Sequence, residues 1–139
     1  MYIDTSSFVQ LYFAEEGSEN SERTVIGQTL VSSQLLYCEF RSALMGKRSR
    51  GIISGETGAE IWNHFLARVR SLEIELVPVE SELVREAAEL LSELHPVIPL
   101  RTLDALHLAT YLSMDAGPFF TKDQRLLAAA RHLGLETAA

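Results

Sequence analysis

Short apolar segments alternate with amphipathic stretches along the chain, and this alternation constrains the fold more than any other feature. Apolar residues at helical spacing predict helices in the longer stretches, whereas the short segments are typical of buried strands. Strands are expected at residues 1–4, 29–32, 74–79, 118–121 and, at an edge, 135–136. Helices are expected at residues 5–12, 20–28, 34–47, 54–70, 81–94, 102–114 and 124–133, the first of them capped by the hydroxyls of Thr5–Ser7. This order predicts an α/β fold with a parallel or mostly parallel sheet that helices cover on both faces.

The length of the chain and its single cysteine indicate the class of protein. With 139 residues, the chain is expected to form one domain over residues 1–139. Cys38 cannot form an internal disulfide, and the segment Met1–Asp4 does not resemble a secretory signal. No apolar run approaches the roughly 18–20 residues that span a bilayer. We therefore expect a cytoplasmic protein without a membrane segment.

The net charge of −7 argues against a protein that holds nucleic acid by bulk positive charge. The charges are unevenly distributed, because the segment 41–50 contains four basic residues and no acidic one. The simplest interpretation of these cations is a solvated helix end, where they also suit the negative end of the helix dipole.

Two acidic residues follow predicted strands. Asp4 ends the first strand, and Asp123 lies just beyond the strand at 118–121. Ligands of parallel sheets bind in the crevice at the carboxyl ends of the strands. The pattern therefore predicts both carboxylates at one edge of the sheet, although each could instead cap the helix that follows it.

Two further acids lie on helix faces that point into the protein. Glu39 falls inside the apolar arc of the helix at 34–47, where an unpaired carboxylate is costly to bury. Asp104 shares the one polar stripe of an otherwise apolar helix with His107 and Tyr111. Such a helix, apolar almost all round, is expected to be central in the fold.

Four carboxylates that met at one place would repel one another unless cations lay between them. Two like charges about 4 Å apart repel by about 4 kcal/mol even at an effective dielectric of 20. All-oxygen ligands suit Mg²⁺ or Mn²⁺, and such a site can activate water for attack on a phosphodiester. Glu39 alone could instead pair with Arg41 or Arg101, so only the four acids together predict a metal site.

The acids lie within four short segments, which are Met1–Ser7, Tyr37–Leu44, Leu103–Ala109 and Thr121–Leu126. In sequence, order and spacing these segments resemble the PIN-domain ribonucleases, and most closely the VapC-like toxins of prokaryotic type II toxin–antitoxin systems. The resemblance covers the whole chain. It implies a PIN-like three-layer α/β/α sandwich whose central, mostly parallel sheet has four to five short strands.

The resemblance also implies a Mg²⁺- or Mn²⁺-dependent endoribonuclease that cleaves tRNA or rRNA and thereby inhibits translation and growth. The catalytic residues, which are also the implied metal ligands, are Asp4, Glu39, Asp104 and Asp123. Ser6 and Thr121 match hydroxyl positions that support the metal and its waters. Candidate contacts to the RNA backbone are Lys47, Arg48, Arg50, Arg101, Lys122 and Arg125.

Other residues of the same segments are interpreted as structural. His107 matches a common family residue, and we expect a buried structural histidine because the site needs none. Tyr37 and Cys38 are expected in the core, since the lone thiol has no evident base beside it. Gln10 stands where many relatives carry a basic residue, so a substrate contact is not predicted there.

Expected partners are the RNA substrate, a VapB-like antitoxin and a second copy of the chain in a homodimer. The apolar face around Ile61, Trp62 and Phe65 either receives a partner helix or belongs to the core. One alternative function is a binding scaffold whose acidic pocket receives a basic side chain without turnover. A phosphotransfer domain is less favoured, because Asp4 lacks the second Asp two residues later that a haloacid-dehalogenase-like nucleophile motif needs.

Overall fold

The computed structural model describes residues 1–13 and 18–138, in which five strands form one parallel sheet of order β3-β2-β1-β4-β5. The strands are β1 (Tyr2–Ile3), β2 (Leu30–Ser33), β3 (Ile74–Val77), β4 (Phe119–Phe120) and β5 (Thr137–Ala138). The helices are α1 (Thr5–Gln10), α2 (Ser18–Val25), α3 (Leu36–Ser49), α4 (Gly55–Arg70), α5 (Ser81–Leu94), α6 (Thr102–Leu112) and α7 (Gln124–His132). The predicted parallel α/β fold is confirmed.

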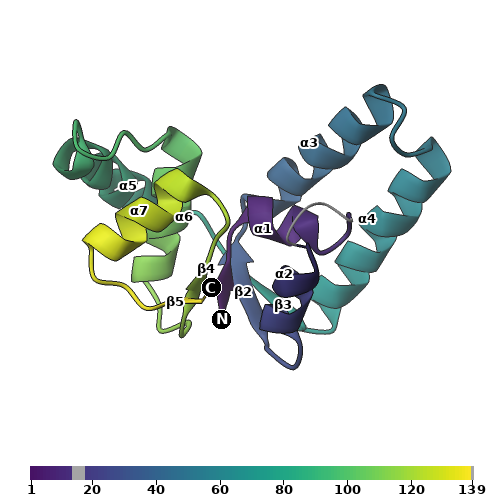
Figure 1. Ribbon diagram of the computed structural model, residues 1–139, viewed down its shortest axis with the longest axis horizontal. Coiled ribbons are helices and arrows are strands. Elements are labelled where there is room, and N and C mark those ends of the chain that lie inside the picture. Colours follow the sequence, from purple (N-terminus) through teal and green to yellow (C-terminus); the bar gives the residue numbers. More distant parts are fainter. Residues whose placement is uncertain (14–17, 139) are drawn as a thin grey trace.

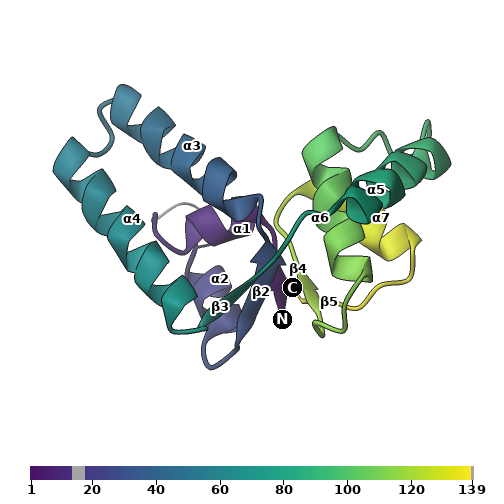
Figure 2. The same cartoon turned by 180° about the vertical axis from the view of Figure 1, so that it is seen from behind.

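Helices cover the sheet on both sides. Helices α1–α4 lie on one side and α5–α7 on the other, as the two opposite views show (Figures 1 and 2). Neighbouring residues of a strand point to opposite faces, so Tyr2 and Phe119 join the core beneath α5–α7, whereas Ile3 and Phe120 join the core beneath α1–α4. This arrangement is the expected three-layer α/β/α sandwich.

The register of the central strands brings two chain segments to one edge of the sheet. Tyr2 pairs with Phe119 and Ile3 with Phe120, so β1 and β4 end level with each other. The backbone N–H of Asp4 donates to the carbonyl of Phe120 at 3.3 Å, one residue beyond both strands. The side chains that follow β1 and β4 therefore start from adjacent points at the carboxyl ends of the strands.

Several element boundaries differ from those expected. The last strand is β5 at Thr137–Ala138, two residues later than predicted, because Leu135 packs against the core instead of pairing in the sheet. Helix α1 ends at Gln10 and is capped by Asp4, whose carboxylate accepts from the N–H of Ser7, and not by the hydroxyls that follow. Residues 14–17 lie outside the described part of the chain.

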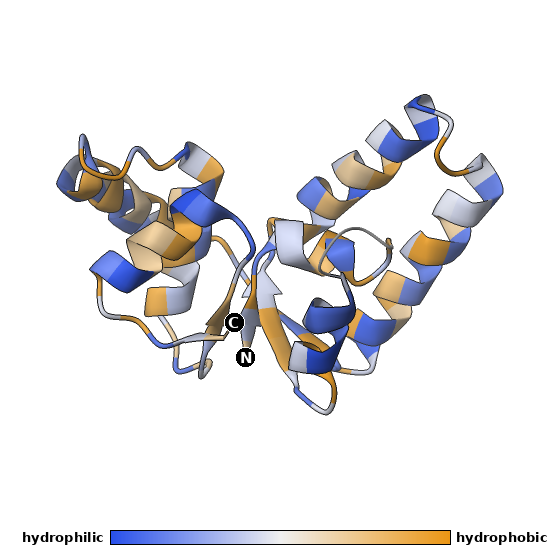
Figure 3. Cartoon of the chain, in the orientation of Figure 1, coloured by the Kyte–Doolittle hydropathy of each residue, from blue (hydrophilic) through white to orange (hydrophobic). Residues whose placement is uncertain are grey.

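Two expectations about apolar surfaces can be compared with the structure. Of the two alternatives for the face at Ile61, Trp62 and Phe65, the structure supports the core, since Phe65 is fully buried and the other two pack against the same core. Helix α6 contacts α5, α7 and the sheet, as expected for a central helix, although Leu103 and Leu112 are each 45% exposed. Hydrophilic and hydrophobic segments alternate along α4, as expected for a helix with one face on the core (Figure 3). None of the described helices is long and apolar enough to cross a membrane.

Candidate active site

All four predicted acids line one pocket of about 410 Å³. They come from four parts of the chain: the end of β1, the first turns of α3 and α6, and the start of α7. The residues around the pocket are Asp4, Thr5, Ser6, Glu39, Arg101, Thr102, Leu103, Asp104, His107 and Asp123. The predicted convergence at the edge of the sheet is therefore present in the fold.

Asp4 is the most deeply placed of the four acids, with only 4% of its surface exposed. Its Oδ1 accepts from the backbone N–H of Ser7 at 3.2 Å, and its Oδ2 accepts from the Ser6 hydroxyl at 2.5 Å. Asp4 is thus the cap of α1 and a pocket residue at the same time. Ser6, predicted as a supporting hydroxyl, holds the Asp4 carboxylate directly.

Asp123 lines the pocket and caps α7. Its Oδ1 accepts from the backbone N–H groups of Arg125 and Leu126 at 2.9 and 3.0 Å. Thr121 is buried and does not line the pocket; its Oγ1 accepts from the backbone N–H of Asp123 at 3.1 Å. Thr121 therefore supports the loop that carries Asp123, and its predicted role beside a metal and its waters stays a prediction.

Asp104 experiences the charge of its neighbours. Burial raises the pKa of its carboxyl and the nearby Asp123 raises it further, while the backbone N–H and the guanidinium of Arg101, together with Arg125, lower it. Its Oδ2 accepts from the Arg101 N–H at 3.1 Å, in a capping box at the start of α6. The raised pKa of Asp104 reflects a site that gathers negative charge away from bulk water.

Glu39 reaches the pocket from α3 and is held through one oxygen. Its Oε1 accepts from the Thr5 hydroxyl at 2.9 Å and from His107 Nε2 at 2.7 Å. His107 is buried, as predicted, but it also lines the pocket and contacts a predicted catalytic residue. Sequence reasoning missed this contact, although the periodicity of the helix places His107 on the same stripe as Asp104.

A second hydrogen bond links His107 to the sheet. Its Nδ1 lies 2.8 Å from the hydroxyl of Tyr2, a fully buried residue of β1. Burial raises the pKa of the Tyr2 phenol, and the charges of Asp4 and Glu39 raise it further. Tyr111, the third residue of the predicted polar stripe, instead donates its hydroxyl to the carbonyl of Gly117 at 3.1 Å, outside the pocket.

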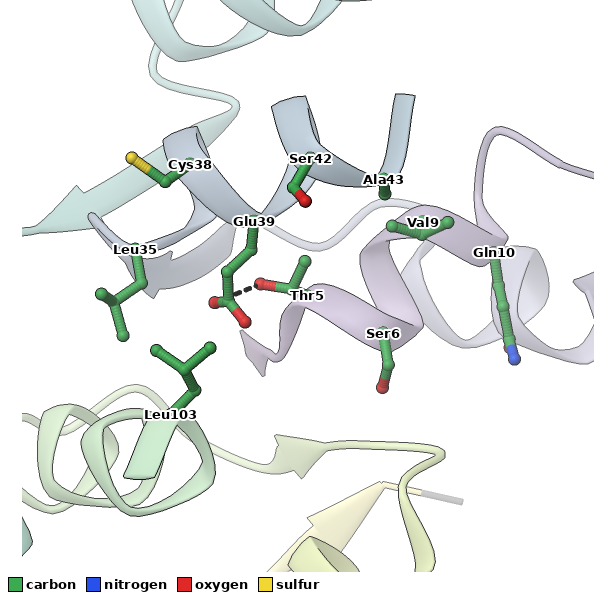
Figure 4. A pocket seen from close by; sticks show the side chains of 10 residues that line it. All are labelled: Thr5, Ser6, Val9, Gln10, Leu35, Cys38, Glu39, Ser42, Ala43 and Leu103. Carbon is green, nitrogen blue, oxygen red and sulfur yellow. Dashed lines mark hydrogen bonds between the residues drawn. The ribbon is translucent and has the colours of Figure 1, made fainter. Parts of the chain in front are cut away.

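A wider groove of about 700 Å³ adjoins the acidic pocket between α1 and α3 (Figure 4). The two share Thr5, Ser6, Glu39 and Leu103. Cys38 lines this groove and is exposed, so the prediction that it belongs to the core is wrong. Figure 4 shows Glu39 between the two helices, with Leu103 of α6 facing it.

The donor chemistry of the acidic pocket fits a hard divalent cation, because four carboxylates supply only oxygen ligands. Within the described residues, no three His, Cys, Asp or Glu side chains are already arranged to hold a metal ion. In the same part of the chain, the only basic side chain within 4 Å of a carboxylate oxygen of these four acids is His107, whose Nε2 lies 2.7 Å from Glu39 Oε1. Among these residues neither lysine nor arginine neutralises the pocket by direct pairing.

The predicted RNA contacts lie at different places. Arg101 lines the acidic pocket, and the positive charge of Arg125 lies close enough to Asp104 to lower the pKa of its carboxyl. Lys47 is 9% exposed and its Nζ lies over the ring of Phe13 at 4.3 Å, which does not favour the predicted contact with RNA. Arg48 and Arg50 are exposed at the far end of α3, roughly 14–17 Å along the helix from Glu39 at 1.5 Å per residue.

Comparison with known proteins agrees with this architecture. Residues 1–132 match the PIN domain family. The chain belongs to the PIN-domain family. This PIN-domain protein is also 32% identical to Ribonuclease VapC46 of Mycobacterium tuberculosis over 142 aligned residues, which cover the whole chain and 96% of the relative. The predicted family and its VapC-like character are confirmed.

Proposed function

We propose that this PIN-domain protein is a Mg²⁺- or Mn²⁺-dependent endoribonuclease and the toxin of a VapBC-like type II toxin–antitoxin system. The observation that carries the proposal is the convergence of Asp4, Glu39, Asp104 and Asp123 on one pocket. Structural acids far apart in a chain have no reason to share a pocket without cationic partners, because their mutual repulsion lowers stability. The similarity to a protein named as a ribonuclease supports the same conclusion.

Each acid has a role that follows from its place in the pocket. Asp4, Asp104 and Asp123 would hold the cation, and Glu39 would ligate it through water or orient the attacking water. The Ser6 hydroxyl keeps the Asp4 carboxylate in place by its hydrogen bond. A bound divalent cation would lower the pKa of a coordinated water and neutralise charge on the phosphodiester.

The substrate and partners follow from the same proposal. The RNA, tRNA or rRNA, would be held beside the pocket by Arg101, Lys122 and Arg125, with Arg48 and Arg50 further along α3. These cations would offset locally the net charge of −7. We propose that one PIN domain over residues 1–139 acts as a homodimer in the cytoplasm, is inhibited by a VapB-like antitoxin, and when released stops translation and growth.

The substitution Asp4→Asn tests the nuclease proposal. Asparagine retains an oxygen that can cap α1, so we expect a folded protein with an unchanged or slightly higher melting temperature but no RNA cleavage. Asp115→Asn is the matched control, because Asp115 is the one remaining aspartate and is exposed outside the pocket. Wild-type protein treated with EDTA should lose cleavage and regain it with Mn²⁺.

The cellular form of this test is induction of both variants and the wild type in a bacterial host, with sequencing of new RNA 5′ ends. New ends should appear with the wild type and Asp115→Asn and be absent with Asp4→Asn. Cleavage by Asp4→Asn protein at the wild-type rate would refute the acidic site as the catalytic centre.

One observation favours a second candidate function. Four carboxylates line one pocket and none of them pairs directly with a lysine or arginine of the described residues, which also suits a pocket that receives an arginine or lysine of a partner without turnover. Calorimetric titration separates the two functions. A nuclease should bind Mn²⁺ in a way that depends on Asp4, whereas a pure receptor for a basic side chain need show no heat of metal binding.

A further inference from the structure

Tyr2, His107 and Glu39 form a hydrogen-bonded line from the interior of the sheet to the acidic pocket. The Tyr2 hydroxyl lies 2.8 Å from His107 Nδ1, and His107 Nε2 lies 2.7 Å from Glu39 Oε1. Both Tyr2 and His107 are buried, and they come from β1 and α6, beside Asp4 and Asp104. Both nitrogens of the imidazole are thus engaged, one with the sheet and the other with the pocket.

The distances decide where a proton lies. A separation of 2.7 Å between Nε2 and a carboxylate oxygen requires a proton between them, since two lone pairs would otherwise face each other. A carboxylate oxygen accepts hydrogen bonds, whereas a ring N–H of imidazole donates one. Nε2 therefore donates to Glu39 Oε1, and the contact of Nδ1 with the Tyr2 hydroxyl fixes the plane of the ring.

This donation leaves the two oxygens of Glu39 in different states. Oε1 accepts from both His107 and Thr5, whereas Oε2 accepts no hydrogen bond from the residues that the structure describes. The Glu39 side chain is 21% exposed, so a carboxylate without these two donors could turn among several rotamers. The second oxygen is the one available to a cation or a water.

We propose that His107 is a positioning residue: by donating Nε2–H to Glu39 Oε1, under the control of Tyr2, it directs Oε2 into the pocket. The importance of this direction for catalysis rests on the proposed nuclease function. A histidine with only a packing role would satisfy its nitrogens within the core. His107 instead donates its Nε2–H to a pocket carboxylate, and outer hydrogen bonds of this kind orient metal ligands.

Three substitutions separate positioning from packing. His107→Leu removes the donor, and His107→Gln retains an N–H that reaches toward Glu39. Tyr2→Phe removes only the hydroxyl at Nδ1, and Tyr111→Phe is its matched control, because Tyr111 packs against the same rings and its hydroxyl bonds elsewhere. Melting temperatures of all variants show which ones are folded.

The first measurement needs neither metal nor catalysis. Long-range ¹H–¹⁵N spectra of the metal-free wild type should show a protonated Nε2 on His107, and Glu39→Ala should shift this resonance. Tyr2→Phe should disturb the imidazole pattern, and Tyr111→Phe should leave it unchanged. An unprotonated Nε2 in the wild type would overturn the proposal, as would an Nε2 resonance of His107 that is the same in the wild type and in Glu39→Ala.

The second measurement is Mn²⁺ affinity by calorimetry. His107→Leu should weaken binding about 10- to 100-fold, the usual cost of losing an outer hydrogen bond to a ligand, and His107→Gln should restore most of it. In a Glu39→Ala background the loss from His107→Leu should nearly vanish, because the effect passes through Glu39. Equal losses in both backgrounds would show a general packing role. A wild type that binds no Mn²⁺ would refute the nuclease proposal. The spectra of His107 would then still test, without metal, whether Nε2–H donates to Glu39.

Discussion

Asp123 allows the structural and the chemical roles of one carboxylate to be measured separately. Its Oδ1 accepts two backbone N–H groups at the start of α7, from Arg125 and Leu126. Asp123→Ala removes this cap, which typically costs about 1 kcal/mol. For a domain of this size that loss lowers the melting temperature by roughly 3 to 5 °C. Asp123→Asn retains an acceptor oxygen at the same place and should leave the melting temperature equal or slightly higher.

The two variants should nevertheless be alike in cleavage. Both remove the charge that would hold a cation, and we expect each to lower the rate by more than about 100-fold, since loss of outer partners alone costs about 10- to 100-fold. The assay is single-turnover cleavage of an RNA substrate with Mn²⁺, beside thermal unfolding of the same samples without metal. Asp115→Asn, an exposed aspartate outside the pocket, serves as the control for charge alone.

A third readout tests the proximity of the acids directly. The charge of Asp123 helps to raise the pKa of Asp104, so Asp123→Asn should lower that pKa toward its ordinary value in a ¹³C titration. Equal destabilisation by asparagine and alanine would refute the capping role of Asp123, and cleavage of RNA by Asp123→Asn at the wild-type rate would refute its catalytic role. An unchanged pKa of Asp104 would contradict the electrostatic part of the argument.

Three further predictions concern pH, metal and salt. Burial raises the pKa of Asp104 in the folded protein above its ordinary value of 3.8, so ionisation of this carboxyl lowers the stability of the fold as the pH rises above 3.8. Asp104→Asn should therefore raise the melting temperature at pH 7, and this gain should vanish as the pH falls below about 3.8. Thermal unfolding from pH 3.5 to 8 measures this, and a pH-independent difference would contradict it. Mn²⁺ at about 100 times its dissociation constant should stabilise the wild type by about 2.7 kcal/mol, and an equal shift in Asp4→Asn would argue against the site. If Arg101, Lys122 and Arg125 contact three phosphates, the logarithm of the association constant for single-stranded RNA should fall with the logarithm of the salt concentration at a slope of about −2. Arg101→Gln should reduce the magnitude of this slope by about 0.7, and an unaltered slope would exclude a contact between Arg101 and the RNA backbone.

The layers of the fold and the meeting of the acids were predictable because both follow from simple rules. Parallel strands present their carboxyl ends at one edge of a sheet, and this rule alone brings Asp4 and Asp123 together. Helical periodicity puts Glu39 and Asp104 on inward faces, and all four acids line the same pocket. The last strand was displaced by two residues, since its pairing with Phe119 depends on how the preceding turn packs.

Contacts between elements were not predictable, because periodicity gives the face of a helix and not what lies opposite it. His107 was correctly expected to be buried, but its bond to Glu39 depends on the approach of α6 to α3. Cys38 follows an inward residue yet is exposed, since the groove between α1 and α3 opens beside it. Lys47 is buried against Phe13, a contact that spacing alone does not reveal.

Capping and catalysis need not be alternatives for these acids. Asp104, Asp123 and Glu39 each have one oxygen that accepts N–H or O–H donors, and the other oxygen accepts none from the described residues. The bonded oxygen fixes each side chain at a helix start or against a neighbouring helix, and the second remains available to a ligand. Backbone amides and hydroxyls are neutral, so they orient the carboxylates without cancelling their charge. The pocket thus combines fixed carboxylates with a negative charge that Arg101 and Arg125 offset only from a distance, and a divalent cation or a partner's basic side chain would relieve it.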